Sequence, residues 1–127
     1  MNLTLSANKI AEQRVLINSI RDEREILPVT VTITAGTFTV DCHEKADTRM
    51  SNAILLWDNL GVTVLPWTMA DNSVENLTES DLIEMQAAVI AARGIRSLQL
   101  HGYAGAIKAS LPIPDNSTQF EGDTWPY

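Results

Sequence analysis

The sequence is short of cysteine, of basic residues and of long apolar runs. Of its 127 residues only Cys42 is a cysteine, so the fold cannot depend on an internal disulfide. Nine basic residues stand against sixteen acidic ones, a formal net charge of -7 that argues against nucleic acid or an anionic membrane as the main partner. No apolar run approaches the roughly 20 residues of a membrane span, and residues 1–6 lack the pattern of a signal peptide. We therefore expect no nucleic-acid partner and no membrane-spanning segment.

Motifs of enzyme catalysis are missing as well. The chain contains no Gly-x-Ser-x-Gly, no Gly-x-Gly-x-x-Gly and no phosphate-binding loop. Its two histidines, His43 and His101, are followed by no motif that would make either one a general base. These absences lead us to expect no enzyme activity and no cofactor.

One group of residues could in principle bind a metal. It comprises Asp41, Cys42, His43, Glu44 and Asp47, and it offers only one half of the paired spacing that structural zinc sites use. We interpret it as a solvated corner between a strand and a helix and expect no metal. A small hydrolase or metal-dependent enzyme that uses Asp41, His43 and Glu44 is the alternative.

Hydrophobic periodicity predicts helices at both ends and strands between them. Ser6 is a plausible N-cap for a helix over residues 7–25, and apolar and threonine residues alternate over 29–34, as in a half-buried strand. A turn at 35–36 and a return strand over 37–40 complete a hairpin. Further along the chain, the same signals predict a helix over 49–60 and a second hairpin with strands over 62–69 and 73–77. A long helix follows over 81–111.

These elements predict an α+β fold: an N-terminal helix, two β-hairpins forming a small antiparallel sheet with an intervening helix, then a long C-terminal helix and an extended tail. The boundaries divide the chain into an N-terminal helix (1–27), an α+β domain ending in the long helix (28–111) and an extended C-terminal arm (112–127). Helix caps are expected from Asp47 or Thr48 for the second helix and from Thr78 for the long one. Gly94 could kink that helix. The residues expected in the core share the inward phase of their elements: Val31, Ile33, Phe38, Val40, Ile54, Trp57, Met85 and Val89.

Four aromatic residues are candidates for binding a partner. Trp67, beside Pro66, is either a core residue or an exposed anchor, and the sequence leaves both open. Phe120, Trp125 and Tyr127 lie in a polar, turn-rich tail from which we expect no core. Tryptophan and tyrosine are typical anchors of protein–protein interfaces, so we expect the tail to be an arm that contacts another chain.

Several short motifs resemble an uncharacterised domain of bacteriophage tail and tail-fibre-associated proteins. The resemblance extends from Gly36 to about Leu111, and Asp71-Asn72 stands where that family usually has Asp-Gly. The matching motifs are residues 38–41 (FTVD), 48–54 (TRMSNAI), 67–74 (WTMADNSV) and 77–82 (LTESDL), with 21–24 (RDER) upstream.

The resemblance implies a structural role in the virion and no catalytic residues. It implies an adaptor that links a tail or baseplate to fibre proteins, is made in the bacterial host cytoplasm and is located in the tail. Other tail, baseplate or fibre proteins would be its partners, and self-association into a homo-oligomer stays open. A tail-fibre assembly chaperone that is absent from the mature virion is the alternative.

Overall fold

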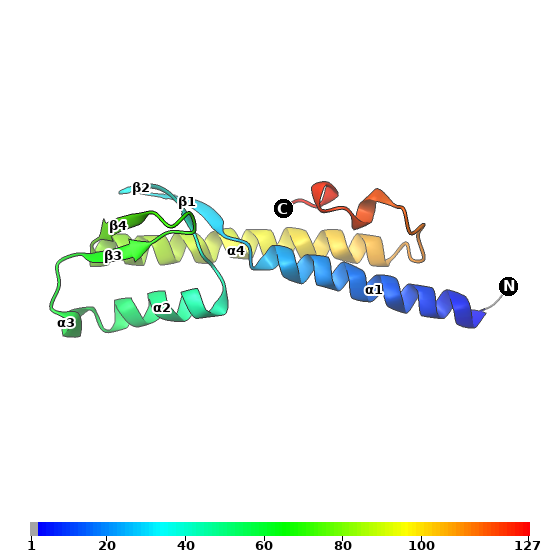
Figure 1. Cartoon of the computed structure of the whole chain (residues 1–127), viewed down its shortest axis with the longest axis horizontal. Helices are drawn as coiled ribbons and strands as arrows, with labels where there is room; N and C mark the ends of the chain where they lie inside the picture. The colour runs from blue at the N-terminus through cyan, green and yellow to red at the C-terminus, as the bar shows by residue number, and fades with distance from the viewer. Residues whose placement is uncertain (1–2) are drawn as a thin grey trace. The chain divides into compact units, whose positions relative to one another are not determined.

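The computed structural model describes residues 3–127, with side chains from Ser6 onward. The fold is α+β, as the sequence predicts: an N-terminal helix, two small antiparallel hairpins and a long C-terminal helix (Figure 1). The chain divides into two compact units. The hairpin unit is Ile26–Gly94, and the helix unit combines the described part of Met1–Glu25 with Ile95–Tyr127.

Two hairpins form the strands of the hairpin unit. The first pairs β1 (Val29–Ile33) with β2 (Gly36–Val40), and the second pairs β3 (Leu65–Thr68) with β4 (Val74–Leu77). Each hairpin is its own two-stranded sheet, and the amide of Ala70 donates to the carbonyl of Thr39 at 3.0 Å, which joins the two. β3 is shorter than expected because Val62 and Val64 lie in the loop before it.

The helix between the hairpins starts earlier than predicted. It begins at Glu44, as α2 (Glu44–Leu55), and a short α3 (Trp57–Leu60) follows it. The expected caps Asp47 and Thr48 are wrong because Nδ1 of His43 accepts a hydrogen bond from the amide of Ala46 at 3.2 Å and caps the helix one turn before them. Asp41, Cys42 and His43 therefore connect β2 to α2, as expected of a corner between a strand and a helix, and Glu44 and Asp47 lie in the first turn of α2.

The long helix, α4 (Glu79–Lys108), runs without a break past Gly94. Its predicted cap is confirmed: Oγ1 of Thr78 accepts from the amide of Asp81 at 3.1 Å, and Oδ2 of Asp81 accepts from the amide of Thr78 at 3.0 Å. This reciprocal pair satisfies two amides that the helix leaves without partners. The first half of α4 belongs to the hairpin unit and the second half to the helix unit.

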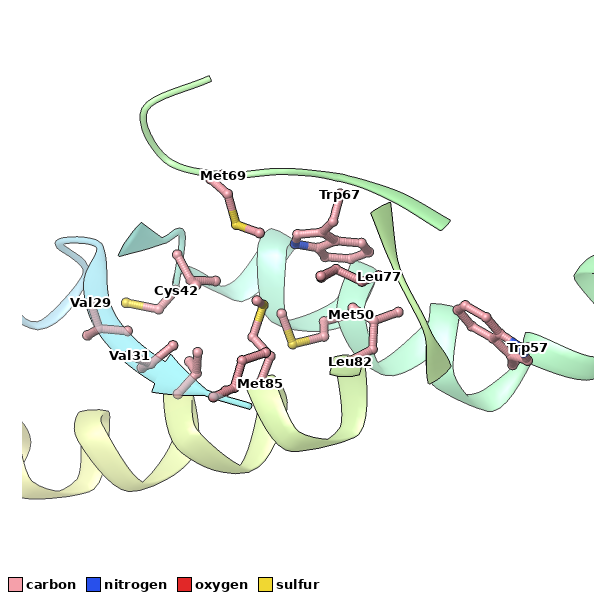
Figure 2. Close-up of a cluster of buried hydrophobic side chains, with 13 residues drawn as sticks. Val29, Val31, Cys42, Met50, Trp57, Trp67, Met69, Leu77, Leu82 and Met85 are labelled. Carbon is pink, nitrogen blue, oxygen red and sulfur yellow. The ribbon is translucent and has the colours of Figure 1, made fainter. Parts of the chain in front are cut away.

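The core of the hairpin unit gathers side chains from both hairpins, from α2 and from the first half of α4. Figure 2 shows Trp67, Leu77, Met50, Leu82 and Met85 meeting in this cluster. Six of the eight predicted core residues are buried, and Phe38 and Ile54 are partly buried against the same cluster.

The helix unit has a smaller core, formed by segments that are far apart in the sequence. α1 (Leu3–Glu25) begins before Ser6, so the predicted cap there is wrong. Ile17 of α1 packs with Leu100 and Ala104 of α4. The expectation that the tail adds nothing to a core is also wrong, because Trp125 is buried in this same cluster. Two 3₁₀ turns, Thr118–Phe120 and Gly122–Thr124, fold the tail back.

None of the described helices is both long enough and apolar enough to span a membrane.

Candidate functional site

The hairpin unit has an apolar groove on its surface. It encloses about 400 Å³ beside Trp67 of β3. Its walls come from the end of α2, from α3 and from β3, and its lining residues are Arg49, Asn52, Ala53, Leu56, Leu60, Leu65, Pro66, Trp67 and Thr68. Grooves with mostly apolar walls and few polar groups are the usual form of a binding site.

Trp67 is held in place by the β3–β4 hairpin. It pairs with Glu75 in the register of the hairpin, and its side chain is on the buried face of β3. Figure 2 shows the indole packed over Leu77 and Met50. Of the two interpretations left open for this residue, the core one therefore holds, and the buried Trp67 also lines the groove.

Leu56 and Leu60, which follow the end of α2, form the outer part of the groove. Leu56 follows α2 directly and its carbonyl accepts from the amide of Leu60 at 3.1 Å, which forms the short α3. Gly61 then ends α3 in the left-handed conformation, with φ of 64°, and turns the chain toward β3. Both leucines remain substantially exposed. The turn therefore presents apolar side chains instead of burying them.

Arg49 is the one charged side chain that lines the groove. It is exposed, and no ion pair with another described residue holds it. Arg93, by contrast, pairs with Asp47 in the same unit. The guanidinium of Arg49, beside the apolar walls, can donate two parallel hydrogen bonds to a carboxylate of a bound molecule.

Sequence reasoning found Trp67 but missed the other residues of the groove. The available signal was the number of apolar residues between Ile54 and Leu65, which exceeds what one buried face of a helix or of a strand accounts for. Leu55, Val62 and Val64 are exposed too. Exposed apolar side chains that line a groove, as those of Leu56 and Leu60 do, are typical of a binding surface, whereas Leu55 lies outside the groove.

The three tail residues lie in the helix unit. Trp125 is buried, its ring centroid lies 4.9 Å from that of Tyr103, and its Nε1 donates to the carbonyl of Gln119 at 3.0 Å. Phe120 is partly buried against the same cluster, whereas Tyr127 is exposed. The structure thus gives Trp125 and Phe120 partners inside the chain and leaves Tyr127 as the accessible aromatic residue of the tail.

The residues of the possible metal site have other contacts. The Cys42 thiol is buried and donates to the carbonyl of Leu27 at 2.8 Å, His43 caps α2, and Asp47 pairs with Arg93. Over the described residues, no three His, Cys, Asp or Glu side chains are placed to hold a metal ion. The second histidine, His101, lies in the helix unit with its Nε2 2.5 Å from Oε1 of Glu25.

A protein-family model, described as Domain of unknown function (DUF4376), matches residues 7–119 of the chain. The match takes in the strands, α2, α3, α4 and nearly all of α1. Neither the curated proteins nor the solved structures give a significant match.

Proposed function

We propose that this chain, which belongs to the DUF4376 family of unknown function, is a structural adaptor of a bacteriophage tail. In this proposal it binds other tail, baseplate or fibre proteins and remains in the virion. The placement in a tail comes from the motif resemblance. The observation that carries the adaptor role is the apolar groove beside Trp67.

The groove favours a protein segment as its occupant. Its leucines and Pro66 offer apolar contact along an open trough, and Arg49 adds one positive charge at its lining. An extended segment with a large apolar side chain and a nearby carboxylate satisfies both features. Interfaces of this kind draw most of their binding energy from a few buried anchors, and the trough offers room for such an anchor.

The test compares two adjacent leucines that differ in their relation to the groove. Leu56 lines the groove, whereas Leu55 does not and is 79% exposed. We expect Leu56→Glu to place a charge in the apolar trough and to reduce incorporation into purified particles about tenfold or more, since an unpaired charge in an apolar contact is costly. Leu55→Glu, with the same charge change, should be incorporated as the wild type is. Quantitative mass spectrometry of particles measures both, and circular dichroism of the purified variants checks the fold.

Other outcomes would change the proposal. Normal incorporation of Leu56→Glu would show that the groove is not the docking surface. A wild-type protein that is needed for assembly but is absent from finished particles would be an assembly chaperone. Arg49→Glu should weaken incorporation as well, and a compensating Lys in an acidic partner segment should restore it.

A further inference from the structure

The second half of α4, in the helix unit, has a solvent-facing side without charged residues. From Ile95 to the end of the helix at Lys108, the exposed side chains include no Lys, Arg, Asp or Glu. Two of them are large and apolar, because Ile95 is 55% and Leu98 is 78% exposed. A chain with a formal net charge of -7 usually covers a solvated helix face with charges, so this side is unusual for the molecule.

The exposed residues of this side follow the spacing of a helix–helix seam. Ile95, Leu98, Gly102 and Gly105 are separated by three, four and three residues, which places them at the a and d positions of a heptad. The opposite side of the same segment, with Leu100, Ala104 and Ile107, packs into the core of the helix unit. The seam therefore faces away from the fold of its own chain.

The glycines of the seam are not required by the chain itself. A Cβ atom added at Gly102 or at Gly105 would meet nothing within 4 Å, and both residues have ordinary helical backbone angles. Glycine weakens a helix interior, and two glycines on one open face leave room for a close approach from outside the chain. The seam has large side chains at its N-terminal end and glycines at its C-terminal end. Two copies that run in opposite directions can therefore fit the large side chains of each over the glycines of the other.

We propose that this face binds the same face of a second copy of the chain, with the two α4 helices antiparallel. A two-fold axis near residue 100 pairs Leu98 of each copy with the partner's Gly102, and it pairs Ile95 with the partner's Gly105. Each large side chain then enters the space over a glycine, and both contacts occur twice, as in an isologous interface.

The seam is short, which sets the strength of the association. It covers about three turns of helix, less than the surface that a stable dimer buries, so the dimer is weak and depends on concentration. Sedimentation of the purified full-length protein over a wide range of concentrations should show a reversible monomer–dimer equilibrium. A sedimentation coefficient that stays monomeric at the highest concentration would overturn the proposal.

A matched pair of variants locates the interface. Leu98→Glu places a charge in the seam and should weaken dimerisation about tenfold or more. Val15→Glu is the control, because Val15 is also largely exposed, at 69%, and lies on α1 of the same unit. It should leave the equilibrium unchanged. Dimerisation that survives Leu98→Glu, with the fold intact by circular dichroism, would exclude this face.

Gly102→Ala separates association from folding. The added methyl group has open space in the chain, so the variant should fold and gain thermal stability. The same methyl group occupies the space that the partner's Leu98 would enter, so dimerisation should weaken several-fold. A variant that is more stable and dimerises as well as the wild type would contradict the proposed packing.

Disulfide trapping tests the direction of the helices. In the antiparallel arrangement, a mixture of Leu98→Cys and Gly102→Cys proteins should form more of the mixed disulfide than of either homodimer. In a parallel arrangement the two homodimers would dominate, which would overturn the register. Cys42 is buried and present in every protein, so peptide mapping of the linked residues completes the measurement.

Discussion

The two units of this chain reach their cores by different routes. The hairpin unit takes one continuous stretch, Ile26–Gly94, whose hairpins, α2 and first half of α4 all contribute to a single cluster. The helix unit joins two segments that are far apart in the sequence: α1, and the stretch that runs from the second half of α4 through the tail. Thirteen described residues are buried in the first core and five in the second. We expect the helix unit to be the less stable of the two, because it closes long loops for less buried area.

The units also differ in what joins their segments. In the hairpin unit the contacts between elements are chiefly apolar, with Thr34 adding its amide and hydroxyl as donors to Glu84 Oε1 at 2.7 and 3.0 Å. In the helix unit a buried glutamine links α1 to the segment after α4. Gln13 donates to the carbonyl of Ile113 at 2.6 Å and accepts from its amide at 3.0 Å. Gln13 therefore adds a polar link between α1 and the segment after α4 to the small apolar core of the helix unit.

The largest effect is expected from Trp67→Ala in the hairpin unit. Trp67 is 8% exposed and packs against Leu77 and Met50 in the cluster in Figure 2, so its removal leaves a cavity in the core. We expect the free energy of unfolding to fall by about 3–5 kcal/mol. Urea denaturation followed by circular dichroism measures the loss. Hydrogen exchange should place it in residues 26–94, and exchange confined to the helix unit would contradict the assignment.

Trp125→Ala is the matched change in the helix unit. Trp125 is 5% exposed, similar to Trp67, but it lies near the end of the chain, among a few partly buried neighbours such as Phe120. We expect a loss of about 3 kcal/mol, toward the lower end for tryptophan, because the tail can relax into the space. Faster hydrogen exchange in α1 and in residues 95–127 would show it. A loss larger than that of Trp67→Ala would reverse the comparison between the units.

The difference between the units also explains which parts the sequence could predict. Alternating Val29, Val31 and Ile33 and the cap at Thr78 are local signals, so the hairpins and α4 were predictable. His43 as a cap was missed because Asp47 and Thr48 are stronger cap residues by type, and only the geometry favours the histidine.

The folded tail and the groove depend on contacts that have no sequence period. Trp125 packs against Tyr103 within the helix unit, and no sequence spacing predicts this contact. Leu56 and Leu60 become groove residues only because α2 ends and α3 turns the chain, which a helical pattern over 49–60 conceals. Trp67 was a candidate by its residue type, with a core position and an exposed one both left open, and the structure places it in the core.

Gln13→Ala tests whether one side chain holds the helix unit together. The change leaves the amide and the carbonyl of Ile113 without their partner in a part-buried place. We expect a loss of about 1–3 kcal/mol, which is the range for unsatisfied buried groups. Gln99→Ala is the control, because Gln99 is an exposed glutamine of α4 in the same unit. Equal thermal denaturation of the two variants would show that the Ile113 groups find other partners.

The smallest effect should come from two exposed carboxyl groups, one in each unit, whose partners differ in distance along the chain. A hydrogen bond from Lys9 lowers the pKa of Asp115, with its positive charge and a hydrogen bond from Gln13 adding to the shift. Hydrogen bonds from the hydroxyl and amide of Ser73 lower the pKa of Asp71, at 2.6 and 2.9 Å.

The dependence of stability on acidic pH should distinguish the contributions of these two carboxyl groups. A pKa that is lower in the folded state stabilises the fold above the unfolded pKa of about 3.9, and the gain is lost as the pH falls through the folded value. Lys9 and Asp115 come together only when the helix unit folds, so Asp115→Asn should flatten the fall in stability between about pH 5 and pH 3. Asp71 bonds a residue two positions away, and such a turn can persist in the unfolded chain, so Asp71→Asn should change that slope less. Urea midpoints at several pH values measure both slopes, and a larger change for Asp71→Asn would show that the long-range pair does not help to hold the helix unit.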